Sequence, residues 1–294
     1  MFDLARYLAA QSGRVNAALE ALLPAESERP VELHRAMRYS LFAGGKRLRP
    51  VLCLAAAEAC GGAGESVLRA ACALECLHTY TLVHDDLPAM DDDALRRGLP
   101  TAHVVFGEAT AILAGDALLT LAFELLAGCV APPPRAPGTL VFELARAAGS
   151  RGVVGGQCED LASEGRAADA EVLRYIHRHK TAVLLQAACR MGALAAGAPD
   201  AQLDALSRYG ENAGLAFQIA DDVLDATATP EQMGKGTGRD AENGKLTCVK
   251  LYGVEESRRQ ARQLCDAAVQ ALERFDERAE PLRAIARFTV ERER

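Results

Sequence analysis

The sequence contains no tryptophan, and only 5% of its 294 residues are aromatic. Runs of β-branched residues are also scarce, whereas alanine and leucine dominate the hydrophobic residues, which make up 50% of the chain. Strands favour β-branched and aromatic residues, while alanine and leucine favour helices. We therefore predict an all-α fold. A chain of this length can bury one large core, so we expect a single domain over residues 1–294.

The N-terminus lacks the basic segment followed by an apolar run that marks a secretory signal. Every 18-residue apolar stretch carries a charge, so no membrane span is predicted. The nine cysteines include no C-x-x-C pair. They are therefore interpreted as small core residues in a reducing compartment, which predicts a cytoplasmic protein.

The net charge of −7 argues against nucleic acid as the main partner. The sequence has no phosphate-binding glycine loop of the Walker type, and neither a Ser-His-Asp arrangement nor an obvious nucleophile stands out. Small anionic molecules are not excluded, because local lysine and arginine clusters or bound metal ions can reverse the local field.

An acidic cluster follows an apolar helical run and is itself followed by Arg96 and Arg97. Such a cluster is either a solvated loop or a site for Mg²⁺, which prefers carboxylate oxygens. Pro88 disfavours a continuous helix, but a turn could return the end of the cluster to its beginning. Five carboxylates lie within these nine residues: Asp85, Asp86, Asp91, Asp92 and Asp93.

A second acidic cluster ends another apolar helical run. Asp221 and Asp225 are four residues apart, so they share one helix face, which Gln218 joins. One acidic cluster alone would be interpreted as a solvated surface. Two clusters that each end an apolar helix favour metal binding.

Basic residues gather in three further places. Gly44 and Gly45 permit a tight turn before Lys46, Arg47 and Arg49, which could be a solvated loop or an anion site. His78 lies two helical turns before Asp85 and could act as a neutral donor to a phosphate oxygen. The second basic segment is Lys180-Thr181. The third is a glycine-rich stretch over residues 234–245, which contains Lys235 and Lys245. We predict that this stretch is a mobile lid.

Two carboxylate clusters that face each other in a helical bundle would hold several Mg²⁺ ions, which would bind a diphosphate. Lys180, Lys235 and Lys245 would complete the charge balance. The chemistry that fits is departure of diphosphate with its charge stabilised electrostatically. Walls of alanine, leucine and phenylalanine predict an apolar organic group.

The combination of these motifs resembles the trans-isoprenyl diphosphate synthases, and most closely the bacterial farnesyl diphosphate synthases. The resemblance spans nearly the whole chain. It rests on the basic segment Gly44–Pro50, the first aspartate motif Asp85-Asp86-x4-Asp91 with Arg96-Arg97-Gly98, His179-Lys180-Thr181, the second motif Asp221-Asp222-x2-Asp225, and Gly244-Lys245.

The resemblance implies an antiparallel helical bundle around a deep central cavity, in a homodimer. It implies Mg²⁺ binding by Asp85, Asp91, Asp221 and Asp225, with Asp86 and Asp222 in support. The allylic diphosphate would be held by Arg96, Lys180, Thr181, Gln218, Lys235 and Lys245, and isopentenyl diphosphate by Lys46, Arg49, His78 and Arg97. The allylic diphosphate would ionise, the isopentenyl double bond would attack the cation, and a proton would be lost to the released diphosphate.

Product length is predicted from Tyr80, about 7.5 Å below Asp85 on an ideal helix. In the family this position helps to form the cavity floor, and an aromatic residue there is typical of farnesyl synthases. The alternatives are a geranylgeranyl diphosphate synthase, for which a smaller residue would be expected, and a non-catalytic partner subunit. One departure from the family is Leu246-Thr247-Cys248-Val249, where many relatives have Ser-Thr-Tyr-Pro.

Helical spacing predicts the main helices. They cover residues 2–23, 51–60, 67–85, 101–127, 138–161, 169–196, 200–225, 254–276 and 279–291.

Overall fold

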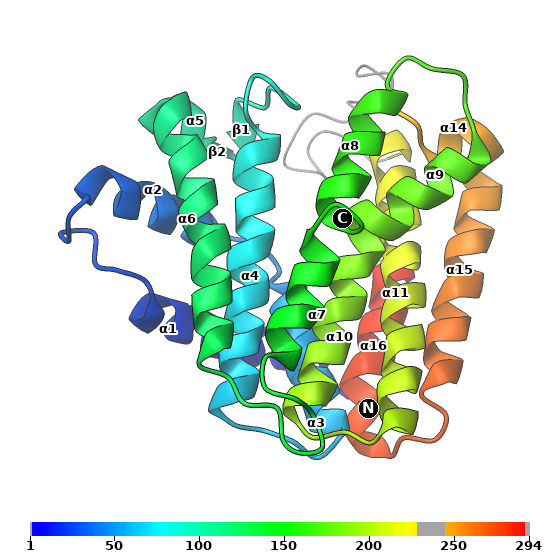
Figure 1. Cartoon of the computed structure of the whole chain (residues 1–294). Coiled ribbons are helices and arrows are strands. Elements are labelled where there is room, and N and C mark those ends of the chain that lie inside the picture. The colour runs from blue at the N-terminus through cyan, green and yellow to red at the C-terminus, as the bar shows by residue number, and fades with distance from the viewer. Residues whose placement is uncertain (1, 228–244, 292–294) are drawn as a thin grey trace.

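The computed structural model describes residues 2–227 and 245–291. These residues form a bundle of long, roughly parallel and antiparallel helices, so the predicted all-α fold is confirmed (Figure 1). The long helices are α1 (Leu4–Leu22), α2 (Val31–Phe42), α3 (Leu48–Ala59), α4 (Glu65–Asp85), α6 (Glu108–Ala127), α10 (Val183–Ala195), α11 (Asp200–Thr227), α15 (Val254–Ala271) and α16 (Glu280–Glu291).

Shorter elements connect or cap the long helices. They are α5 (Ala102–Phe106), α7 (Thr139–Ala148), α8 (Val153–Ser163), α9 (Ala170–Ile176), the π-helix η1 (His177–Ala182), α14 (Cys248–Tyr252) and a 3₁₀ turn (Glu277–Ala279). Side chains mark several helix starts: the Asp3 carboxylate accepts from Arg6 N at 3.0 Å, and the Thr247 hydroxyl accepts from Lys250 N at 3.2 Å. Such N-caps satisfy backbone donors that the first helical turn leaves unpaired.

The core is built from alanine and leucine side chains, which lets the helices approach closely. A Cβ atom built on Gly214 of α11 would lie 2.6 Å from the Cα of Ala182, so α11 and η1 touch along their backbones. The fully buried Tyr209 is held by its hydroxyl, which donates to the Leu282 carbonyl at 2.7 Å. These contacts fix α11 against both η1 and α16.

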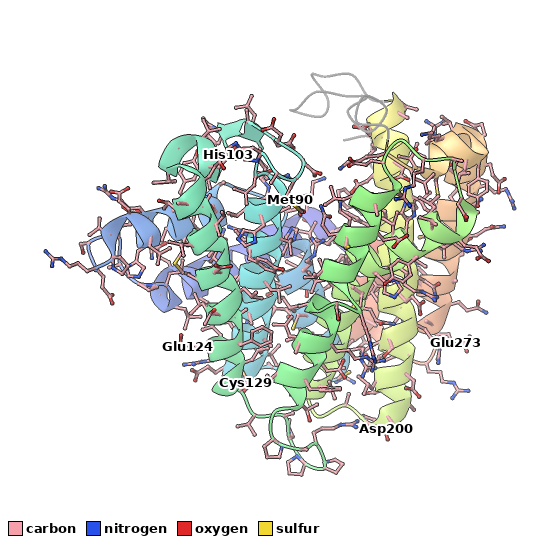
Figure 2. The ribbon with its side chains drawn as sticks, turned by 45° about the horizontal axis from the view of Figure 1, so that its top comes forward. Met90, His103, Glu124, Cys129, Asp200 and Glu273 are labelled. Carbon is pink, nitrogen blue, oxygen red and sulfur yellow. The ribbon has the colours of Figure 1, made fainter. Side chains whose placement is uncertain are left out.

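Helices α4 and α11 end at the same end of the bundle. Figure 2 shows Met90, in the segment after α4, at one end and Asp200, the first residue of α11, at the opposite end. Both helices therefore run toward the end that carries Met90. The two acidic clusters that terminate these helices are consequently brought to one end of the molecule.

The structure corrects three predicted boundaries. The helix predicted over 101–127 is two helices, because Gly107 has φ 81° and separates α5 from α6. The helix predicted over 138–161 ends at Ala148 and resumes at Val153 as α8. The helix predicted over 169–196 contains a π-helical turn at its polar patch, residues 177–182.

A small hairpin was not predicted. Strands β1 (Leu95–Arg96) and β2 (Leu99–Pro100) pair antiparallel after the first acidic cluster. The two residues between them, Arg97 and Gly98, have φ values of 55° and 78°. Two central residues with positive φ give a tight hairpin turn whose twist matches the strands.

One helix of the described part of the chain, α6, is long and apolar enough to cross a membrane. The core helix of a compact protein can satisfy the same criterion, and α6 packs along α4 with 44% of its apolar window buried. The absence of a membrane span and the cytoplasmic location remain predictions.

The close approach of α11 and η1 predicts opposite effects for two glycine substitutions. Gly214→Ala should lower the free energy of unfolding by about 1–3 kcal/mol, because the added methyl group overpacks the contact with Ala182. Gly13→Ala, on the exposed face of α1, meets no atom within 4 Å and should raise it by about 0.5–1 kcal/mol. Urea unfolding of both variants measures the difference, and equal effects would contradict the packing described.

Candidate active site

The first acidic cluster folds into a compact turn at the end of α4. Asp91 N donates to the Asp85 carbonyl at 2.9 Å, and Asp93 N donates to the Asp86 carbonyl at 3.2 Å. The chain therefore returns on itself after Pro88, which confirms the predicted turn. Asp91 lies beside Asp85 through this backbone contact.

The Asp85 side chain is partly buried, and no hydrogen bond to its carboxyl group occurs among the described residues. Burial raises its pKa to about 6, and the nearby Asp91 adds to the effect, while Lys180 and Arg96 oppose it. Desolvation and like-charge repulsion both destabilise an ionised carboxylate, and a bound cation offsets both effects. Asp85 therefore fits the role of an oxygen ligand to a divalent metal ion.

Asp86 has a different role from Asp85. Its carboxylate is buried and pairs with the guanidinium of Arg96. Arg96 Nε donates to Asp86 Oδ1 at 2.7 Å, and Arg96 Nη2 lies 2.6 Å from the same oxygen. Arg96 Nη2 also lies 3.7 Å from Asp93 Oδ2. The two carboxylates hold the arginine at the hairpin, so Asp86 supports Arg96 and is not directed to a metal ion.

A basic cavity of about 540 Å³ lies next to this turn, between the Gly44–Arg49 segment, α4, the hairpin and α11. The guanidinium of Arg97 donates to the Gly44 carbonyl at the wall of the cavity. A Cβ atom built on Gly45 would lie 2.5 Å from the guanidinium carbon of Arg97. A side chain at position 45 would displace Arg97. The cavity is lined by all four residues predicted to hold isopentenyl diphosphate, and by Arg96 and Asp221. Arg47, Glu75, Asp93 and Phe217 line it too, although none of them was predicted to bind a substrate.

His78 and Arg49 are in contact inside this cavity. Arg49 Nη1 lies 3.1 Å from His78 Nε2, and because arginine can only donate, Nε2 is the acceptor. Burial and the surrounding arginines keep the pKa of His78 well below its ordinary value, so the ring is neutral as predicted. Its Nδ1–H is then the atom that can donate to a phosphate oxygen.

Lys180 is held by a residue that the sequence analysis did not identify. Its Nζ lies 2.6 Å from Oδ2 of the buried Asp160 on α8. The two elements touch at Gly156, where a Cβ would lie 2.2 Å from Lys180 N. The pairing of Lys180 with Asp160 could not be read from the sequence.

A buried chain of hydrogen bonds joins η1, α11 and α14. Thr181 Oγ1 donates to Gln218 Oε1 at 2.6 Å, and Gln218 Nε2 donates to Asp222 Oδ1 at 3.0 Å. Asp222 Oδ2 accepts from Cys248 N at 2.8 Å and lies 3.3 Å from His177 Nε2. The carboxylate of Asp222 is thus engaged by protein donors, and it positions Thr181 and Gln218.

Donor atoms of His177, Asp222 and Cys248 also lie within 4.8 Å of one another, a spacing that could hold a metal ion. The hydrogen bonds to Asp222 already account for this arrangement. Cys248 stands where many relatives of the resembled family have tyrosine, and the contact it makes here uses its backbone N–H. The departure in side chain therefore leaves this contact intact.

The end of the glycine-rich stretch reaches the first acidic cluster. Lys245 Nζ lies 3.3 Å from Asp91 Oδ1, with both side chains largely buried. Asp225 lies on the same helix as Asp221 and is partly buried. Lys235 lies outside the described residues, so its predicted role is not tested.

Tyr80 lies on α4 in a half-buried position between Asp85 and Asp116 of α6. Its ring meets the His84 ring edge-on, with centroids 5.3 Å apart, and burial raises its pKa. Tyr80 packs against the main core. Its role as the floor of a substrate cavity remains a prediction.

The donor atoms at this end of the bundle suit Mg²⁺. Asp85, Asp91, Asp221 and Asp225 supply carboxylate oxygens, which this hard cation prefers, and the desolvated Asp85 gains from a cation. Three other acidic residues accept hydrogen bonds from protein donors and are not assigned to the metal: Asp86, Asp160 and Asp222.

The fold and site define an all-α prenyltransferase. The family model for polyprenyl synthetases matches residues 30–285, so the chain belongs to the polyprenyl synthetase family. Members of this class extend prenyl chains, and the chain is a prenyl diphosphate synthase of this kind. The resemblance found in the sequence is confirmed.

Relatives agree with this assignment. "Geranylgeranyl pyrophosphate synthase 7, chloroplastic" of Arabidopsis thaliana is 47% identical, over 99% of this chain and 85% of the relative. "Heterodimeric geranylgeranyl pyrophosphate synthase large subunit 1, chloroplastic" of the same plant is 45% identical, over 99% and 80%. The solved apo structure of an FPP/GFPP synthase from Zymomonas mobilis is 37% identical with a TM-score of 0.86, and the match covers 98% of each chain.

The raised pKa of Asp85 predicts that Asp85→Asn stabilises the metal-free protein. Between pH of about 4 and 6 the folded state binds more protons than the unfolded state, so wild-type stability falls as pH rises through this range. Above pH 6 the variant should gain roughly 1–3 kcal/mol in free energy of unfolding, and the gain should vanish near pH 4.

Unfolding in the presence of a chelator, followed from pH 4 to 8, measures this gain. Asp92→Asn removes an exposed carboxylate from the same turn and should change stability little. A gain that is equal for both variants, or equal at all pH values, would contradict the assigned burial of Asp85.

Proposed function

We propose that the protein catalyses the Mg²⁺-dependent, head-to-tail condensation of isopentenyl diphosphate with an allylic diphosphate to give geranylgeranyl diphosphate. The observation that carries the proposal is the placement of two aspartate motifs and a basic cavity at one end of the bundle. One subsite can hold a diphosphate through metal ions, and the other can hold a second diphosphate through arginine, lysine and histidine side chains without a metal ion.

The residues divide between two subsites. Asp85, Asp91, Asp221 and Asp225 hold Mg²⁺, which when bound supplies positive charge to the leaving diphosphate. Among the metal-binding aspartates, Asp91 forms an ion pair with Lys245. The positive charge of Lys180, on η1, lowers the pKa of Asp85. Arg96, Thr181 and Gln218 complete the described part of the allylic subsite, and the predicted contribution of Lys235 lies outside the described residues.

The basic cavity holds isopentenyl diphosphate. Lys46, Arg49 and Arg97 supply positive charge, and His78 donates its Nδ1–H. Arg49 keeps its charge at neutral pH, because burial lowers its pKa only to about 10. Phe217 places an apolar surface beside the prenyl groups. No side chain of the described residues is assigned as a general base, and we propose that the proton lost after condensation goes to the released diphosphate.

Product length is where the comparisons and the sequence differ. The two relatives at 45–47% identity carry geranylgeranyl names, which favours the C20 product over the farnesyl product expected from Tyr80. The solved structure at 37% identity is named an FPP/GFPP synthase. A farnesyl product is the second candidate, because the aromatic Tyr80 lies one and a half turns below Asp85.

The product assay distinguishes these candidates. With Mg²⁺, labelled isopentenyl diphosphate and farnesyl diphosphate as the starter, the purified protein should form a C20 product and stop there, because the proposed cavity accepts that length. A C15 product from dimethylallyl or geranyl diphosphate, with farnesyl diphosphate left unextended, would support the second candidate. No product from any starter would favour a non-catalytic subunit.

Tyr80→Ala tests the floor in the same assay. Removing the ring should lengthen the product relative to wild type. Tyr175→Ala, which removes an exposed tyrosine on α9, should leave the product distribution unchanged. An unchanged distribution for Tyr80→Ala would contradict the assigned role of Tyr80.

We also propose that the protein forms a homodimer through α6. Ile112 and Leu113 are 43% and 57% exposed on this helix, and Val104 and Val105 extend the apolar surface along α5. Exposed apolar surface of this kind marks an interaction site. One relative is named as part of a heterodimer, so a different partner chain is the alternative.

Charge on this surface should produce a monomer. The double variant Ile112→Glu/Leu113→Glu should elute and scatter light as a monomer, because a buried dimer contact does not tolerate unpaired carboxylates. Val130→Glu changes an exposed valine elsewhere and should leave the mass unchanged. A wild-type protein that is itself monomeric would contradict the proposed homodimer.

A further inference from the structure

Arg47 lines the basic cavity between Lys46 and Arg49, but its guanidinium is engaged by protein acceptors. It is 4% exposed and has a left-handed backbone, with φ 49°. Its guanidinium donates to Asn16 Oδ1 at 2.9 Å, to the Leu41 carbonyl at 2.6 Å and to Glu75 Oε1 at 2.7 Å. Arg47 therefore ties the segment that carries Lys46 and Arg49 to α1, α2 and α4.

Glu75 connects this anchor to the rest of the cavity. Its side chain is 2% exposed, and it stands one helical turn before His78 on the same face of α4. Glu75 Oε2 and Arg49 Nε are both buried, and neither has a hydrogen-bond partner within residues 2–227 and 245–291. The negative charge of Glu75, with a smaller contribution from Asp221, raises the pKa of Arg49 against the lowering effect of burial.

We propose that Arg47 and Glu75 are a positioning pair for the isopentenyl diphosphate subsite. Arg47 fixes the position of the backbone that carries Lys46 and Arg49. Glu75 has two roles: it accepts a hydrogen bond from Arg47, and its negative charge stabilises the positive charge of Arg49. Neither residue of the pair needs to touch the reacting atoms. The inference rests on the proposed function, because it assigns the cavity to isopentenyl diphosphate.

Folding alone does not explain the pair. Replacing a buried ion pair by apolar residues of similar size is often neutral for stability, whereas removing one partner is strongly destabilising. An apolar pair would also avoid the buried Glu75 Oε2, which has no hydrogen-bond partner among the described residues. The retained charges and directed hydrogen bonds are accounted for by the orientation they give to Lys46 and Arg49.

The test uses the double variant Arg47→Met/Glu75→Leu, which removes both charges of the buried pair together. The KM for isopentenyl diphosphate should rise about tenfold, as expected when hydrogen bonds to a charged group are misplaced. The KM for the allylic substrate and kcat should stay within roughly twofold, which marks a loss of ground-state binding at one subsite.

A matched ion pair serves as the control. Arg190 and Glu143 join α10 to α7 through contacts of 2.6 and 2.7 Å, away from the basic cavity. Arg190→Met/Glu143→Leu should leave both KM values unchanged. Should the first double variant not fold, Arg47→Lys keeps the charge opposite Glu75 but cannot reach all three acceptors, and it should give a smaller rise in the same KM.

The outcomes separate the pair from the proposed function. If Lys46→Gln raises the KM for isopentenyl diphosphate and the pair variants do not, the positioning role is overturned while the subsite stands. Equal changes in both KM values would also overturn it, because they indicate a general loss of structure. A wild-type protein without any product would overturn the proposed function itself.

Discussion

Like charges held together at the end of a helical bundle are the constraint on which the rest of this structure depends. Two helices that run in the same direction bring two aspartate clusters to one end. Carboxylates so placed repel one another, and burial adds a desolvation cost, which is visible in the raised pKa of Asp85. The surrounding protein must offset this cost while leaving room for a metal ion and a diphosphate.

The protein divides the acidic residues between two duties. Asp86 holds Arg96, Asp160 holds Lys180, and Asp222 holds Gln218 and the start of α14. These carboxylates are satisfied within the fold and orient cations and amides around the site. Asp85 lacks such donors among the described residues and gains most from a bound cation.

The sequence predicted much of the fold and the chemistry of the site, because the signals were local. Alanine and leucine periodicity gave the long helices, and Pro88 indicated the turn that returns Asp91 to Asp85. Breaks inside helices were missed where they depend on a single residue such as Gly107. The hairpin at Arg97 was missed because its strands are too short to show a pattern.

Partners across helices could not be predicted. Asp160 and Glu75 lie far in sequence from Lys180 and Arg47, and each looks like an ordinary polar residue on its own helix. Phe217 gave no signal beyond helix packing, although it lines the basic cavity. The expectation of a farnesyl product rested on Tyr80 alone, and one residue of a cavity wall does not define the cavity's depth.

The most direct test of two distinct diphosphate subsites is a calorimetric titration of each substrate with Mg²⁺ and with a chelator. A non-reactive thiolo analogue of dimethylallyl diphosphate stands for the allylic substrate. The account predicts that this analogue binds only with Mg²⁺, whereas isopentenyl diphosphate binds the basic cavity under both conditions. Metal-independent binding of the allylic analogue, or loss of isopentenyl diphosphate binding in the chelator, would contradict it.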